Sequence, residues 1–203
     1  MSEIITSRPS ILDLSQLTRW IAQRPARTVL ADTDSSTPAA VLVPLVNHPS
    51  GTTILLTQRT AHLEHHPGQV SFPGGRLEPA DQGCAITCAL RETVEEIGLS
   101  QDNVTVLGCL DELRTGTGFR VIPVIGFVHP PFTLELDSFE VAEVFEVPIS
   151  FICDKSNHQR MKRMVDGVEK SWWSLTWQGR VIWGLTASIL VSLQDELASS
   201  GVL

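Results

Sequence analysis

Three glutamates stand close together near the middle of the chain, at Glu92, Glu95 and Glu96. If this segment is helical, they occupy positions i, i+3 and i+4 and share one face of the helix. Neighbouring carboxylates repel one another, and Arg91 is expected to point about 100° away around the helix. A hard divalent cation with oxygen ligands therefore suits these acids better than one arginine does. A solvated acidic face is the simpler alternative.

Glycines flank this acidic segment on both sides. Gly98 is expected to end the helix, because glycine readily takes the left-handed conformation found at helix C-termini. Upstream, Gly74 and Gly75 let the backbone approach a ligand closely and leave a carbonyl free to coordinate a metal. The Gly75 carbonyl and the three glutamates together predict an oxygen-rich site for Mg²⁺ or Mn²⁺. Such an ion supports hydrolysis of a phosphorus ester or anhydride.

The elements that must position these residues alternate in type along the chain. Helices are expected at residues 10–24, from 81 or 82 to 97, at 149–153 and at 185–198. Strands are expected at 39–46, 52–57, 68–72, 104–110, 121–128, 160–165 and 171–177. The first two are expected to form a hairpin, and the last two to form another around Asp166 and Gly167. This order predicts a single α/β domain whose mixed β-sheet is covered by helices on both faces. Residues 1–35 are expected to form an N-terminal helix and a linker loop, and residues 36–203 the main domain with the C-terminal helix.

Composition limits the classes of function. The chain has 203 residues, of which 42% are hydrophobic and 19% charged, as is typical of a globular chain. Its formal net charge of −8 argues against non-specific binding to nucleic acid or to an anionic membrane. A phosphorylated small molecule is compatible with this charge, because a bound divalent metal reverses the local field. The four cysteines lack paired C-x-x-C spacing and the N-terminus lacks a basic segment before an apolar run, so we expect a cytoplasmic protein.

The segment from Gly75 to Leu99 resembles the motif of the Nudix hydrolases, G-x5-E-x7-R-E-U-x-E-E-x-G-U, in which U is a bulky apolar residue. The second half of the motif matches, with Thr93 in place of the first apolar residue. In the first half Asp81 replaces the glutamate, and nine residues instead of seven separate it from Arg91. That glutamate usually braces the arginine in the family. The resemblance therefore implies that Asp81, or else Glu78, contacts Arg91 in the catalytic site.

This resemblance implies an α/β/α sandwich with a mixed sheet and a metal-dependent pyrophosphohydrolase activity. In the family the glutamates that match Glu92 and Glu96 are the principal metal ligands, and the one that matches Glu95 assists. Glutamates in a loop after the motif can act as general base or bind a further metal. Glu140 and Glu143 are the candidates for this role, and an acidic loop without a catalytic role is the alternative.

Residues 55–75 resemble the pattern that precedes this motif in coenzyme A pyrophosphatases, roughly L-L-T-x-R-S/A-x3-R-x3-G-x3-F-P-G-G. The substrate-binding residues that this resemblance implies are Arg59, Phe72, Gly74 and Gly75. Glu64 stands where that branch carries an arginine, which reverses the charge. The implied reaction is hydrolysis of the diphosphate of coenzyme A or its thioesters, giving 3′,5′-ADP and 4′-phosphopantetheine or its acyl form.

Two other functions are open at this point. One is a broader nucleoside diphosphate-X hydrolase that acts on substrates such as ADP-ribose, and the other is a non-catalytic Nudix-fold module that senses a nucleotide. The histidines that can contact a phosphate, or simply lie in solvent, are His62, His65 and His66. The tryptophans that can stack on an adenine, fill the core or form a homodimer interface are Trp172, Trp173, Trp177 and Trp183.

Overall fold

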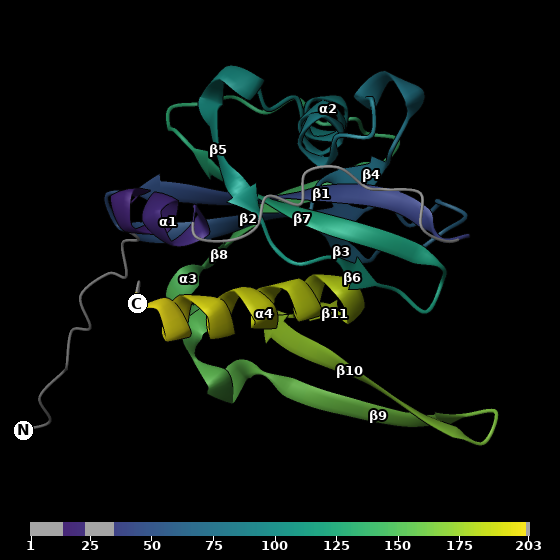
Figure 1. Ribbon diagram of the computed structural model, residues 1–203. Coiled ribbons are helices and arrows are strands. Elements are labelled where there is room, and N and C mark those ends of the chain that lie inside the picture. The colour runs from purple at the N-terminus through teal and green to yellow at the C-terminus, as the bar shows by residue number, and fades with distance from the viewer. Residues whose placement is uncertain (1–13, 23–34, 202–203) are drawn as a thin grey trace, which may run out of the picture.

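The computed structural model describes residues 14–22 and 35–201 (Figure 1). The helices are α1 (Leu14–Ile21), α2 (Ala85–Ile97), α3 (Ile149–Cys153) and α4 (Gly184–Ser200). The strands are β1 (Thr37–His48), β2 (Gly51–Arg59), β3 (Val70–Ser71), β4 (Gly74–Arg76), β5 (Val104–Cys109), β6 (Leu113–Arg114), β7 (Phe119–Val128), β8 (Val141–Pro148), β9 (Gln159–Val165), β10 (Val168–Trp177) and β11 (Arg180–Trp183). Short 3₁₀ helices lie at η1 (Pro79–Asp81), η2 (Gln101–Asn103) and η3 (Lys155–Asn157). The predicted strands and helices occur in the predicted order, but strands β4, β6, β8 and β11 were not predicted.

The main sheet has eight strands and is mixed, as predicted. Its central path runs β3-β2-β1-β7-β5, and β4, β6 and β8 pair with β1, β7 and β2 respectively. Strands β1 and β7 are parallel, whereas β1 and β2 form the predicted antiparallel hairpin. The long apolar strand β1 therefore lies at the centre of the sheet, where both of its faces can be buried.

The two faces of β1 pack against different helices. On one face, Ala40 and Leu42 lie in a core cluster with Cys88 and Ala89 of α2. On the other face, Leu45 lies in a larger cluster that includes buried residues of α1, α3 and α4. Figure 1 shows α2 on one side of the sheet and α3 and α4 on the opposite side. This is the α/β/α sandwich that the resemblance implies.

The C-terminal part of the chain adds a second sheet. Strands β9, β10 and β11 form an antiparallel sheet of three strands, with α4 packed between it and the main sheet (Figure 1). The β9–β10 hairpin was predicted, and it turns at Asp166 and Gly167, whose φ values are 52° and 77°. Positive φ at both central residues favours a two-residue hairpin turn. The separation of this hairpin into its own sheet was not predicted.

Helix α2 begins at Ala85, a few residues later than predicted. Residues Pro79–Asp81 form η1 instead, and Gln82 and Gly83 follow with φ values of 52° and 75°. Two successive left-handed residues do not continue into a right-handed helix, so the helix starts after them. The predicted end is confirmed, because Gly98 caps α2 with a φ of 66°.

The N-terminal helix is described as α1, where Trp20 and Ile21 are buried in the larger core cluster. The predicted limits at Ser10 and Arg24 lie outside the described residues. The predicted division between residues 1–35 and 36–203 stays a prediction. No helix in the described ranges is both long enough and apolar enough to cross a membrane.

Candidate functional site

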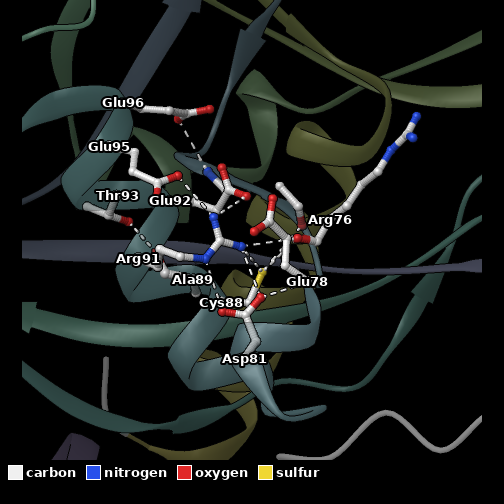
Figure 2. Close-up of polar contacts among 12 residues, drawn as sticks. Arg76, Glu78, Asp81, Cys88, Ala89, Arg91, Glu92, Thr93, Glu95 and Glu96 are labelled. Atoms are coloured by element: carbon white, nitrogen blue, oxygen red, sulfur yellow. Dashed lines mark hydrogen bonds and ion pairs between the residues drawn. The ribbon is translucent and has the colours of Figure 1, made fainter.

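The three glutamates of α2 differ in their exposure to solvent. Glu96 is buried, Glu92 is half-buried and Glu95 is exposed. All three project from the same part of α2 (Figure 2). The helix therefore presents two shielded carboxylates and one that is open to solvent.

Arg91 contacts two of these glutamates, which contradicts the expectation that it points away from them. Its Nη1 donates to Glu92 Oε1 and to Glu95 Oε2, each at 3.0 Å (Figure 2). The contact with Glu95 is an i, i+4 pair, the spacing at which oppositely charged side chains on a helix meet. The acids of α2 are thus partly neutralised within the chain.

Asp81 is the residue that braces Arg91, as the resemblance implied. Arg91 Nε donates to Asp81 Oδ1 at 3.0 Å, and Arg91 Nη2 donates to Asp81 Oδ2 at 2.9 Å. The Asp81 side chain has no exposed surface, and its Oδ2 also accepts from the Glu78 backbone N–H at 2.8 Å. The hydrogen bond from Arg91 holds the pKa of Asp81 below its ordinary value. Glu78 therefore supports Asp81 through its backbone and does not replace it.

Gly74 and Gly75 bring the backbone of β4 against the glutamates. The Gly74 N–H donates to Glu96 Oε2 at 3.3 Å. A Cβ atom at Gly75 would collide with the carboxylate of Glu92, and a Cβ atom at Gly74 would collide with the Ala40 carbonyl. Gly75 is required because β4 approaches α2 too closely for a side chain, and Gly74 is required because β4 approaches β1 too closely.

Burial makes ionisation of the Glu92 and Glu96 carboxylates less favourable. Burial, followed by repulsion from Glu92, raises the pKa of Glu96 to about 8. Burial also raises the pKa of Glu92, against the lowering effect of Arg91. Glu140 adds to the repulsion at both glutamates, and the Arg59 cation opposes it at Glu96. An additional cation beside Glu92 and Glu96 would stabilise their ionised forms.

The residues present fit a divalent cation in chemistry and in charge. Their donors are the hard oxygen atoms that Mg²⁺ and Mn²⁺ prefer, and their negative charge is only partly balanced. In the described part of the chain, no three acidic, histidine or cysteine side chains converge tightly enough to hold an ion as they stand. An ion held by Glu92 and Glu96 would therefore need further oxygen ligands, such as a backbone carbonyl, water or substrate oxygens. The Gly75 carbonyl, the other predicted ligand, faces the Cys88 thiol with 3.6 Å between O and Sγ.

The two candidate bases lie in different surroundings. Glu140 Oε2 is 3.9 Å from Arg59 Nη1, and Glu140 is close enough to affect the titration of Glu96. Glu143 forms an ion pair with Arg180 through both of its oxygens. The structure therefore places Glu140 near the acids of α2, whereas Glu143 is paired with Arg180.

A cavity of about 1210 Å³ opens beside this cluster of acids. Its lining includes Arg59, Gly74 and Gly75, which contact Glu140, Glu96 and Glu92 respectively. The opposite part of the lining comes from α4 and from strands β9 and β10. The cavity thus lies between the two sheets, and its lining meets Glu96, Glu92 and Glu140 through Gly74, Gly75 and Arg59 but does not include these acids themselves.

Other residues singled out in the sequence fall inside or outside this cavity. Phe72 is buried in the larger core cluster and does not line it. His65 and His66 line the cavity, whereas Glu64 does not. His62 lies outside it and packs against Phe139, with ring centroids 4.8 Å apart. Among the tryptophans, the cavity lining includes Trp172, Trp173 and Trp183, while Trp177 packs against Phe151.

Three arginines of the cavity were missed by the sequence reasoning. They are Arg76, Arg114 and Arg160. Arg76 directly follows the paired glycines, and that position was a usable signal. Arg114 and Arg160 lie on strands far from the motif in sequence. Only the folded arrangement places them near it.

Residues 36–176 match the NUDIX domain family. A protein of Photorhabdus laumondii named uncharacterized Nudix hydrolase NudL is 38% identical over 164 residues, which are 81% of this chain and 87% of the relative. A protein of the same name from Yersinia pestis is 36% identical over 160 residues, 79% of each chain. The crystal structure of a MutT/nudix family protein from Enterococcus faecalis aligns with a TM-score of 0.50 at 17% identity, covering 92% of this chain and 70% of that one.

These matches, together with the fold and the Arg91–glutamate cluster, define the class of protein. The chain belongs to the Nudix family of hydrolases. It is a pyrophosphohydrolase, and enzymes of this family use divalent metal ions.

Proposed function

We propose that the chain hydrolyses the diphosphate bond of coenzyme A or its thioesters, with Mg²⁺ or Mn²⁺ as cofactor. The observation that carries this proposal is the placement of the segment that resembles coenzyme A pyrophosphatases. Within that segment Arg59, Gly74 and Gly75 line the cavity and also contact the acids. The cavity volume of about 1210 Å³ suits a ligand larger than a nucleotide monophosphate.

The residues of the site would divide the work of hydrolysis. Glu92 and Glu96 would hold the metal, with Glu95 and the Gly75 carbonyl assisting. When bound, the metal polarises the phosphoryl group and offsets charge on the leaving group. Glu140 would accept a proton from the attacking water, whose oxygen bonds to one phosphorus atom as the bridging P–O bond breaks. The products are 3′,5′-ADP and 4′-phosphopantetheine or its acyl form.

Arg91 and Arg59 would position the acids and the substrate, and neither would serve as the general base. Arg91 holds Glu92 and Glu95 through its fork, which is in turn fixed by Asp81. A planar guanidinium suits such multiple pairing with carboxylates. Arg59 lines the cavity and would contact a substrate phosphate. We expect Glu143, paired with Arg180, to contribute less than Glu140 does.

The second candidate is a broader nucleoside diphosphate-X hydrolase that also accepts ADP-ribose. It is favoured by Glu64, which stands where the coenzyme A branch has an arginine and which does not line the cavity. The complete set of Glu92, Glu95 and Glu96 argues against a module that only senses a nucleotide, because binding alone does not need all three acids.

The test is parallel turnover of coenzyme A, ADP-ribose and NADH with Mg²⁺ or Mn²⁺. We expect the highest kcat/KM for coenzyme A, and we expect Glu96→Gln to lower turnover by about 10³-fold because it removes a charged metal ligand. Glu169→Gln is the matched control, since this exposed glutamate lies on β10 and pairs with Lys162. A clear preference for ADP-ribose would reject the coenzyme A assignment. Full activity in Glu96→Gln would reject the metal assignment.

A further inference from the structure

Two arginines, one from each sheet, line the cavity and rest on aromatic rings. Arg76 of β4 lies over the ring of Phe119, with its Cζ 5.2 Å from the ring centroid. Arg160 of β9 lies over the ring of Trp173 at 4.9 Å. Arg160 Nη2 also donates to Ser171 Oγ at 2.6 Å. Stacking and this hydrogen bond restrict the rotamers of Arg160 before any ligand binds.

Within residues 14–22 and 35–201, these two arginines have no acidic partner, unlike the other arginines of the cavity. Arg59 is paired with Glu140, and Arg114 with Glu112. Neither Arg76 nor Arg160 forms an ion pair with a carboxylate among the described residues. Although the chain has a net charge of −8, two such cations in one cavity favour the binding of an anionic ligand there.

The two arginines lie at different distances along the chain from the acids. Arg76 directly follows Gly75, and Figure 2 shows its side chain extending away from the cluster around Arg91. Arg160 belongs to the second sheet, where its cross-strand partner is Trp173. The acidic residues that line the cavity, Asp195 and Glu196, belong to α4, and Asp195 is paired with Lys155 at 2.9 Å. Arg160 of β9 is thus the cation that the second sheet contributes to the lining of the cavity.

We propose that Arg160 and Ser171 bind a phosphomonoester on the nucleoside part of the substrate, apart from the diphosphate that is cleaved. Stacking on Trp173 leaves the edge of the guanidinium free to donate to phosphate oxygens. The Ser171 hydroxyl accepts from Arg160 and can donate its own proton to the same phosphate. This inference rests on the proposed function for the position of the diphosphate, and it adds that the enzyme selects nucleotides that carry an extra phosphate.

The kinetic test uses two substrates that differ only in this group, coenzyme A and 3′-dephospho-coenzyme A. We expect the wild-type protein to favour coenzyme A. We expect Arg160→Gln to raise the KM for coenzyme A by about tenfold, because charged hydrogen bonds are lost, with kcat within about twofold. The same variant should leave the kinetics with 3′-dephospho-coenzyme A unchanged. Equal losses on both substrates would overturn the proposal.

Arg163→Gln is the matched control for Arg160→Gln. Arg163 lies on the same strand, is exposed, and does not line the cavity. We expect this variant to treat both substrates as the wild-type protein does. A loss of selectivity in Arg163→Gln equal to that in Arg160→Gln would indicate a general charge effect and would also overturn the proposal.

A binding measurement separates this inference from the proposed function. Calorimetric titration with 3′,5′-ADP and with AMP requires no turnover. We expect the wild-type protein to bind 3′,5′-ADP about tenfold more tightly, and Arg160→Gln to bind both alike. If coenzyme A is not cleaved but this difference holds, the proposed function fails and the phosphomonoester site stands. If coenzyme A is cleaved and Arg160→Gln keeps the wild-type preference, the site is wrong.

Discussion

At the scale of single residues, Arg91 is the link between the two halves of the motif. It pairs with Asp81 on one side and with Glu92 and Glu95 on the other. The sequence pointed to Asp81 as its partner through the family resemblance, although the spacing is stretched. The sequence did not reveal how the longer spacing is accommodated. In the structure, Gln82 and Gly83 adopt left-handed conformations between Asp81 and α2, which accommodates the extra residues.

We expect Asp81→Asn to lower the free energy of unfolding by about 3 kcal/mol at pH 7, because Arg91 loses a buried charged partner. The pKa of Asp81 is lowered in the folded state by its hydrogen bond from Arg91. Its stabilising contribution is therefore present at neutral pH and is lost as the pH falls below about 4. Urea denaturation at pH 7 and pH 3 should show a gap between wild-type and variant proteins that narrows in acid.

The control for this prediction is Asp102→Asn, at an exposed aspartate in η2. We expect its unfolding free energy to stay within about 0.5 kcal/mol of wild type at both pH values. A gap for Asp81→Asn that is the same at pH 7 and pH 3 would contradict the assigned role of its charge.

At the scale of elements, the contact between β4 and α2 sets the geometry of the acids. The end of α2 was predicted from Gly98 because a glycine cap is a local signal. Its start was not predicted, since η1 depends on the Asp81 side chain, which accepts from Glu78 N–H and pairs with Arg91. The end of the helix was therefore signalled by one local residue, whereas its start depends on the left-handed Gln82 and Gly83 and on the contacts of Asp81 with Glu78 and Arg91.

The two glycines of β4 give opposite expectations when each is replaced by alanine. In Gly75→Ala the new methyl group meets the flexible Glu92 carboxylate, which can move aside. We expect kcat to fall at least about tenfold because Glu92 is displaced, with a loss of stability below about 1 kcal/mol. In Gly74→Ala the methyl group meets the backbone of Ala40 and Val41 at a φ of 154°. We expect that variant to lose about 2 kcal/mol or more.

Turnover rates and thermal unfolding of the two alanine variants check this pair of expectations. A Gly75→Ala protein with normal kcat would show that the position of Glu92 does not matter to the reaction. A Gly74→Ala protein as stable as wild type would show that the backbone of β4 can retreat from β1.

At the scale of the whole molecule, the main sheet and its helices could be predicted, and the second sheet could not. The alternating apolar segments give the sandwich, because each strand and helix carries its own periodicity. The cavity depends on how β9, β10 and α4 meet the main sheet, which no local pattern encodes. The pairing of Arg160 with Trp173 likewise depends on strand register.

Metal binding should appear as a change in the stability of the whole fold. Glu92 is half-buried, Glu96 is buried, and the two repel each other, so a divalent cation that binds them favours the folded state. We expect Mg²⁺ or Mn²⁺ to raise the melting temperature. At a metal concentration one hundred times the dissociation constant, the free energy of unfolding should increase by about 2.7 kcal/mol. A Glu92→Gln, Glu96→Gln double variant should show no such rise, and Glu169→Gln should show the wild-type rise. A rise of equal size in the double variant would place the ion elsewhere.

The two-sheet construction of the cavity has an evolutionary consequence. The acids and glycines lie on the main sheet and α2, whereas Arg160, Ser171 and Trp173 lie on a hairpin that shares no strand with that sheet. Mutations in this hairpin can accumulate without disturbing the residues that carry out hydrolysis. Divergence of β9 and β10 is therefore a low-cost path to new substrates, and exchange of this hairpin between relatives should transfer substrate preference while the chemistry stays the same.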